Sequence, residues 1–140
     1  MLSQTAEYAL RAVLYLARGP KRKAIPADAI ARALGAPANY LAKTLNVMAR
    51  AGIVAGLRGP TGGFVLLRDP AELTIAEVIG TFDEPVAEPM CLLGGRPCDP
   101  TQPCEAHRHW TGVLAAMRAP LTATTVADLL SNVVELKEAV

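Results

Sequence analysis

Apolar residues at helical spacing predict three helices in the first third of the chain. The predicted helices span residues 3–18, 26–34 and 38–51. Ser3 can cap the first helix, and Pro26 suits the first turn of the second. Gly35 and Gly52 follow the second and third helices, a position where glycine commonly ends a helix. The tight turn between the last two helices is typical of a helix-turn-helix.

The third predicted helix has an apolar face and a polar face. Leu41, Leu45 and Met48 share the apolar face, which predicts that this side packs in the core. The polar face carries Asn39, Lys43, Asn46 and Arg50. Such side chains reach base edges and phosphates in a major groove, although a solvated face would also be polar. A solvated face usually mixes charges of both signs, and no acid occurs between residues 29 and 68, so a recognition helix is favoured.

Two short apolar runs after this helix predict a β-hairpin. They cover residues 53–57 and 64–67 and enclose a turn rich in glycine and proline, from Arg58 to Gly63. A hairpin directly after a helix-turn-helix is typical of a wing, which would place Arg58 and Thr61 near the DNA backbone. A purely structural hairpin is the alternative interpretation.

The C-terminal part predicts a long apolar helix followed by a short one. The long helix begins near Cys104, and Pro120 bends or ends it. Its apolar stripe consists of Trp110, Leu114, Met117 and Leu121. A small domain with a projecting apolar helix often completes its core with a second copy, so we expect a homodimer. Thr125 and Asp128 form a capping box that opens the last helix, residues 126–138.

Composition and charge narrow the class of protein. The 140 residues suit one domain, and with 51% hydrophobic but only 4% aromatic residues the core must consist of Ala, Leu and Val. No apolar run approaches the roughly 20 residues that span a bilayer, and no signal peptide is recognised, so a cytoplasmic protein is expected. Residues 1–70 contain ten Lys and Arg but only three Asp and Glu, whereas residues 71–140 contain four Lys and Arg and ten Asp and Glu. This asymmetry suits a first half that meets a polyanion, although ordinary surface solvation would also account for it.

All three cysteines lie in or beside an irregular segment, residues 83–103, which five prolines interrupt. It follows a short helix predicted over residues 73–82, with Thr74 as its cap. The cysteines are Cys91, Cys98 and Cys104. Their odd number argues against a disulfide framework, and neighbouring thiolates favour a shared metal. Structural zinc sites usually show closely spaced cysteine pairs, which are absent here, so an iron–sulfur cluster is favoured over zinc.

The fourth ligand has two candidates. His107 follows Cys104 by three residues, so both can share one face of the first helical turn. His109 lies five residues after Cys104 and points elsewhere. Glu7 is the alternative ligand, and its plain interpretation is an ion pair with Arg11 one turn along the first helix. Catalytic sets such as Ser-His-Asp, a P-loop or paired carboxylates are not recognised, so we do not expect an enzyme.

The whole chain resembles the winged-helix iron–sulfur regulators typified by IscR and NsrR. The residues that carry this resemblance are Tyr8-Ala9-Leu10-Arg11, Asn39-Tyr40-Leu41, Arg58-Gly59-Pro60-Thr61-Gly62-Gly63-Phe64, the three cysteines with Glu105-Ala106-His107, and Thr125-Val126-Ala127-Asp128-Leu129. The resemblance implies a homodimer on a partly palindromic operator, and a cluster held by the cysteines. His107 matches the IscR branch with [2Fe–2S], which we favour, whereas Glu7 matches the NsrR branch with [4Fe–4S] and a ligand from the other subunit. The first cysteine gap is one residue longer than the usual five in both branches.

The resemblance and the helical face together define the expected DNA contacts. Asn39, Tyr40 and Arg58 occupy matched positions, and Ala42 stands where IscR has an acid used in operator choice. The full expected set is Asn39, Tyr40, Lys43, Thr44, Arg50, Arg58 and Thr61. The resulting hypothesis is a mainly α-helical DNA-binding repressor, gated by a cluster that senses redox state, nitric oxide or cluster status. It has three parts, a winged helix-turn-helix over 1–82, a cluster loop over 83–107 and dimerisation helices over 108–140. A cluster-free or zinc-containing regulator with a thiol switch, and an iron–sulfur electron carrier, are the alternatives.

Overall fold

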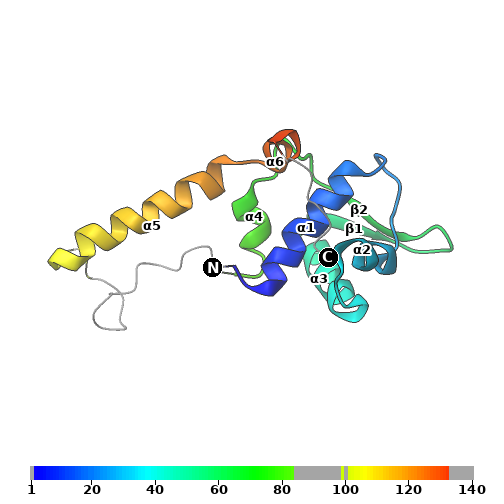
Figure 1. The fold of residues 1–140 in the computed structure, drawn as a ribbon, viewed down its shortest axis with the longest axis horizontal. Coiled ribbons are helices and arrows are strands. Elements are labelled where there is room, and N and C mark those ends of the chain that lie inside the picture. Colours follow the sequence, from blue (N-terminus) through cyan, green and yellow to red (C-terminus); the bar gives the residue numbers. More distant parts are fainter. Residues whose placement is uncertain (1, 84–98, 100, 133–140) are drawn as a thin grey trace.

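The computed structural model describes residues 2–83, 99 and 101–132. It is mainly helical with one two-stranded antiparallel hairpin, which confirms the predicted fold class (Figure 1). The helices are α1 Gln4–Arg18, α2 Ala27–Leu34, α3 Ala38–Arg50, α4 Ile75–Ile79, α5 Glu105–Ala123 and α6 Val126–Asn132. Within the described part of the chain, no helix is both long and apolar enough to cross a membrane.

The first three helices form the core of the winged helix. Small residues on α1 (Ala9, Ala12 and Val13) are fully buried and let α2 and α3 approach closely. Ser3 caps α1 as predicted, because its hydroxyl accepts a hydrogen bond from the Ala6 N–H at 3.2 Å. Gly35 ends α2 in the left-handed conformation, with a φ of 63° that a glycine adopts without strain. The tight α2–α3 turn of a helix-turn-helix follows from that glycine.

The hairpin strands are β1 Val54–Leu57 and β2 Gly63–Leu66, close to the predicted runs. Their register pairs Val54 with Leu66 and Leu57 with Gly63. Ile25 forms an isolated antiparallel β-bridge to β2, because its N–H and C=O both bond to Phe64, at 2.9 and 2.8 Å. A side chain at Gly63 would lie 2.3 Å from the Ile25 carbonyl, so only glycine allows this approach. The base of the wing is thereby joined to the α1–α2 connection.

Backbone hydrogen bonds connect α4 to the segment between α5 and α6. The Ile75 N–H donates to the Thr124 carbonyl at 3.0 Å, and the Val126 N–H donates to the Leu73 carbonyl at 2.8 Å. Val126 is fully buried, which fixes the start of α6 against the core. The predicted helix over residues 73–82 is shorter in the structure, because the Thr74 cap comes after Leu73 and α4 ends before Gly80. The predicted continuation of α6 from residue 133 to 138 lies outside the described residues.

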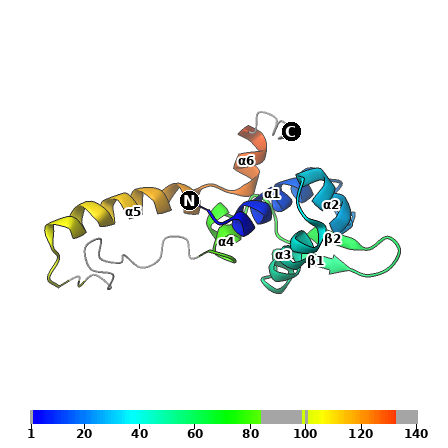
Figure 2. The same ribbon diagram turned by 60° about the horizontal axis from the view of Figure 1, so that its bottom comes forward.

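The long helix α5 projects away from the winged helix (Figures 1 and 2). None of its 19 residues is buried, and the apolar side chains of Val113 and Met117 are each 49% exposed. Of the two outcomes predicted for Pro120, a bend or an end of the helix, the structure excludes the end, because α5 continues to Ala123. Cys104 is its N-cap residue, so the helix resumes where the sequence indicated.

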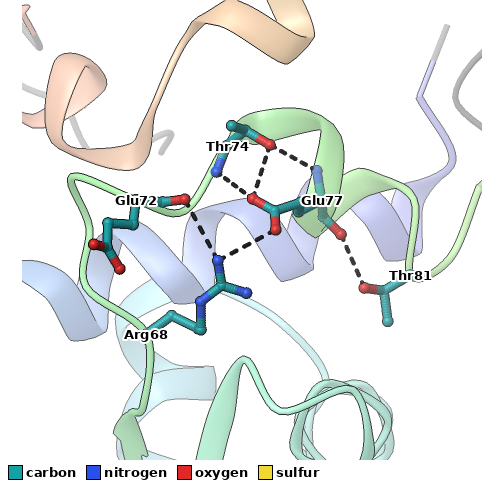
Figure 3. Close-up of polar contacts among 5 residues, drawn as sticks. All are labelled: Arg68, Glu72, Thr74, Glu77 and Thr81. Carbon is teal, nitrogen blue, oxygen red and sulfur yellow. Dashed lines mark hydrogen bonds and ion pairs between the residues drawn. The ribbon is translucent and has the colours of Figure 1, made fainter.

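A polar network connects the exit of the wing to α4 (Figure 3). Glu77 and Thr74 form a capping box, in which the Glu77 carboxylate accepts from the Thr74 N–H at 2.9 Å. The Arg68 guanidinium donates to the other Glu77 carboxylate oxygen at 3.2 Å. The backbone N–H of Thr74, followed by its hydroxyl and by the Arg68 charge, lowers the pKa of Glu77 below its usual 4.5.

Replacing Glu77 with alanine is expected to lower the free energy of unfolding by about 1 kcal/mol at pH 7, the usual contribution of a helix cap. Since the folded pKa of Glu77 is lowered, this stabilisation is present above pH 4.5 and is lost as the pH falls through the folded value. Urea unfolding of both proteins between pH 7 and pH 3 measures this difference. Glu77→Gln is the matched control, because it keeps a capping side chain without a titrating group. A pH-independent difference for Glu77→Ala would contradict the assignment.

Candidate DNA-binding surface and metal ligands

The polar face of α3 is exposed to solvent, and its apolar face is buried in the core. Leu41, Leu45 and Met48 are fully buried, as the spacing predicted. The four polar positions, Asn39, Lys43, Asn46 and Arg50, are all exposed. The two faces therefore fix the rotation of α3 about its axis and leave one continuous row of amide and cationic side chains accessible.

Tyr40 is oriented by residues of α1 at the start of the recognition helix. Its hydroxyl shares a hydrogen bond with the Thr5 hydroxyl, and its ring meets the Tyr8 ring edge to face at a centroid distance of 6.0 Å. The Arg11 guanidinium lies 6.0 Å from the centre of the Tyr8 ring and also donates to the Leu34 carbonyl at 3.2 Å. Tyr40 remains 38% exposed, so its ring is held in place while one side stays accessible.

Thr44 is a correction to the expected DNA contacts. It is only 3% exposed, and its hydroxyl donates to the Tyr40 carbonyl one turn earlier, at 3.0 Å. At position 44 the helix faces the core rather than the polar side, and a threonine satisfies its hydroxyl there by bonding to the backbone. The prediction of a DNA contact for Thr44 was wrong, and the residue serves in packing.

The tip of the wing is exposed and positively charged. Arg58 and Thr61 are both exposed, and the Gly62 N–H closes the turn onto the Gly59 carbonyl at 2.9 Å. Gly59 has a φ of 107°, which a residue with a side chain rarely adopts. Within the described residues, neither Arg58 nor the two cations on the polar face of α3 takes part in an ion pair. Their charge is therefore available for phosphates.

The predicted metal ligands are only partly within the described residues. Cys91 and Cys98 lie outside them. Cys104 is exposed at the N-cap of α5, and the His107 N–H donates to its carbonyl at 3.0 Å, so both belong to the first turn. The Nδ1 atom of His107 is buried and has no hydrogen-bond partner among the described residues. A thiol and an imidazole nitrogen are donors suited to iron or zinc.

Glu7, the alternative ligand, lies far from this turn within one chain. Its carboxylate is exposed and lies 3.8 Å from the Arg11 guanidinium, which confirms the predicted ion pair. Both views place α1 within the winged helix and the first turn of α5 at the far end of the projecting helix (Figures 1 and 2). Within the described residues, no three His, Cys, Asp or Glu side chains lie close enough together to hold a metal.

Sequence reasoning missed the role of Thr5. Thr5 and Tyr8 lie three residues apart and so share one face of α1, which is visible in the sequence. Their common partner, Tyr40, is 35 residues beyond Thr5, and no local pattern indicates that contact. The packing of α1 against α3 creates it.

Comparison with known proteins identifies the family. The model of the Rrf2 family, described as an iron-dependent transcriptional regulator, matches residues 2–132. The chain is 32% identical over 133 residues to an HTH-type protein of Aquifex aeolicus, covering 94% of this chain and 92% of that protein. It is 28% identical over 131 residues to the transcriptional regulator IscR of Cronobacter sakazakii, covering 94% of this chain and 80% of IscR.

A solved structure shows the same fold. CymR, the global cysteine regulator of B. subtilis, aligns with a TM-score of 0.80 at 25% identity, covering 95% of this chain and 98% of CymR. The resemblance inferred from the wing and cysteine motifs is thereby confirmed at the level of the family. The chain belongs to the Rrf2 family of winged-helix transcriptional regulators and is not an enzyme.

Proposed function

We propose that this protein is a cytoplasmic repressor that binds DNA as a homodimer, with an operator affinity controlled by a [2Fe–2S] cluster. The observation that supports DNA binding is the exposed row of amide and cationic side chains on α3, beside a cationic wing tip. Asn39 and Tyr40, at the start of α3, would reach base edges, because the first residues of a recognition helix enter the major groove. Lys43, Arg50, Arg58 and Thr61 would contact phosphates.

The dimer rests on the exposed apolar stripe of α5. Among the described residues, α5 packs on the rest of its chain only near its end, where Leu121 contacts the cluster of Ala6, Ile75 and Ile79, and none of its residues is buried. A helix that projects in this way gains little stability in water on its own. Pairing with the same helix of a second copy would cover Val113 and Met117 and give a two-fold axis. A two-fold dimer would present its recognition helices to successive major grooves, which suits a partly palindromic operator.

The cluster would be held by Cys91, Cys98, Cys104 and His107. The exposed Cys104 thiol fits such a group, and so does the Nδ1 atom of His107 in the same helical turn, which has no partner among the described residues. When bound, the cluster supplies a centre that changes oxidation state and reacts with nitric oxide or is lost. This chain contributes the ligand turn at one end of α5, and the same helix carries the dimer stripe. A change in the ligand turn would therefore alter the dimer that positions the recognition helices.

A second function is a cluster-free regulator that uses its cysteines as a thiol switch. The exposed Cys104 thiol and the likeness to the cysteine regulator CymR favour it. In that case the protein would bind DNA without iron, and oxidation of Cys104 would change the affinity.

Anaerobic purification followed by iron, acid-labile sulfide and zinc determination separates these functions. We expect two irons and two sulfides per chain in the wild type, with loss of both in Cys104→Ala and in His107→Ala. His109→Ala is the matched control, because it removes an exposed imidazole from the same helix. Four irons per chain, lost in Glu7→Gln and kept in His107→Ala, would replace the proposed ligand set with the alternative one. Zinc alone, or no metal, would contradict the cluster and leave the DNA-binding surface as proposed.

A further inference from the structure

A half-open cleft of about 360 Å³ lies between the end of α1, the α1–α2 connection and the end of β2. Leu16, Val65 and Leu67 contribute an apolar part to its lining. Lys21, Arg22 and Lys23 line the rest as three consecutive cations. Its volume falls at the lower end of the range for small-molecule sites in proteins, roughly 300 to 1,000 Å³. The cleft combines a concave apolar surface with a concentrated positive charge.

The three cations lack a compensating charge. Within the described residues, none of Lys21, Arg22 and Lys23 takes part in an ion pair. Arg68 also lines the cleft, but its guanidinium is paired with Glu77 at 3.2 Å. The single acid of the lining is Asp69, and its carboxylate accepts a hydrogen bond from the Ala71 N–H at 2.9 Å. The cleft therefore carries a net positive charge that attracts anions.

The walls of the cleft are fixed by backbone contacts. The Lys23 N–H donates to the Pro20 carbonyl at 3.2 Å, which closes a turn around Lys21 and Arg22. Arg22 has a φ of 64°, in the left-handed region where residues with a side chain are uncommon. Ile25, just beyond the turn, is joined to Phe64 by two backbone hydrogen bonds. The cationic turn is thus held against β2 by the sheet itself, which lowers the entropy cost of binding a ligand there.

The cleft lies away from the start of the recognition helix. The Thr5 hydroxyl, near the beginning of α1, contacts Tyr40 at the start of α3. Gly19, at the other end of α1, lines the cleft. With a rise of 1.5 Å per residue, the helix separates these two ends by about 20 Å (Figure 1). A duplex held by Asn39 and Tyr40 is therefore not the natural partner of the cationic turn.

We propose that this cleft binds a small anionic molecule that joins a carboxylate or phosphate group to a short apolar portion. The anionic group would meet the Lys21–Lys23 turn, and the apolar portion would lie on Leu16, Val65 and Leu67. The ligand would bridge the α1–α2 connection and the base of the wing, two elements of the DNA-binding unit. The cysteines take no part, so the proposal is independent of the cluster.

Titration of the ¹⁵N-labelled full-length protein with isovalerate and, separately, with isobutyl phosphate tests this proposal. We expect saturable shifts of the backbone amides of residues 19, 21–23 and 65–69 with at least one probe. Because the two probes share the same apolar portion, stronger binding of isovalerate identifies a carboxylate ligand, and stronger binding of isobutyl phosphate identifies a phosphate ligand. The triple variant Lys21→Ser, Arg22→Gly and Lys23→Ser should weaken binding by about tenfold or more, because it removes the charged donors.

A matched triple variant controls for total charge. Lys43→Ser, Arg50→Ser and Arg58→Ser removes three cations from α3 and the wing, and it should bind the probes as the wild type does. Equal weakening in both variants, or shifts that do not saturate and spread over all basic residues, would overturn the proposal. A third result would also overturn the proposal. If neither probe binds saturably and the Lys21–Lys23 variant binds duplex DNA more weakly, the turn contacts DNA phosphates instead of a small anion. Lys21→Ser alone, with an unchanged far-UV spectrum, provides the same test if the triple variant does not fold.

Discussion

Replacing both Lys43 and Arg58 with alanine is expected to weaken operator binding on the order of 100-fold or more. The two side chains are exposed and take part in no ion pair within the described residues, so their charge would go to DNA phosphates. In a dimer the double variant loses four cations, which lowers the slope of log affinity against log salt by about 3 to 4. Fluorescence anisotropy at several salt concentrations, on an operator selected from random duplexes, measures both quantities.

The matched control for this experiment removes the same charge elsewhere. Arg18 and Arg32 are exposed cations that lie outside α3 and the wing. Their double alanine variant should keep the affinity within a factor of a few and leave the salt slope almost unchanged. If both double variants lose affinity and slope equally, the interaction is a diffuse attraction to the protein's charge, and the assigned surface is wrong.

Introducing glutamates at Val113 and Met117 is expected to dissociate the dimer and to reduce operator affinity by a factor of about 10² to 10⁴, the usual gain from linking two binding modules. The two side chains lie one turn apart on α5, Met117 on the apolar stripe and Val113 at its edge, and each is 49% exposed in the single chain. Two carboxylates per chain would face two more across the two-fold axis, which opposes pairing by repulsion and by desolvation. Sedimentation equilibrium measures the oligomeric state, and anisotropy measures the affinity.

Ala115→Glu with Ala119→Glu is the control for this second experiment. These positions have the same spacing as Val113 and Met117 but lie on the opposite side of α5, and both are exposed. The control variant should remain a dimer with wild-type operator affinity. Dissociation of the control, or a dimer that survives Val113→Glu with Met117→Glu, would place the interface elsewhere on the molecule.

The winged helix could be predicted because its signals are local. Leu41, Leu45 and Met48 repeat at helical spacing, and burial of all three follows from that repeat. The glycines of the wing turn specify a hairpin by their backbone freedom alone. Pro120 does not end α5, which continues to Ala123 although the proline nitrogen has no hydrogen to donate to the carbonyl one turn earlier.

The candidate site could be predicted only where exposure follows from helical phase. Asn39, Lys43 and Arg50 are exposed as expected, whereas Thr44 lies one position away from the polar face and belongs to the core. The contact between Thr5 and Tyr40 depends on how α1 packs against α3, which no local pattern encodes. The association of the Lys21–Lys23 turn with the end of β2 depends in the same way on the isolated β-bridge between Ile25 and Phe64.

The junction between α4, α5 and α6 makes the projecting helix a lever. Its root is held by the hydrogen bonds of Ile75 to Thr124 and of Val126 to Leu73, while its 19 residues extend for about 28 Å. A rotation of about 10° at the root corresponds to a movement of about 5 Å at the tip, where Cys104 and His107 lie. A displacement of a few ångströms at the tip therefore corresponds to a rotation of only a few degrees at the root of α5. If two copies pair along α5, tip movements of several ångströms would change the spacing of the two recognition helices. Thermal motion of a fraction of an ångström would leave that spacing almost unchanged.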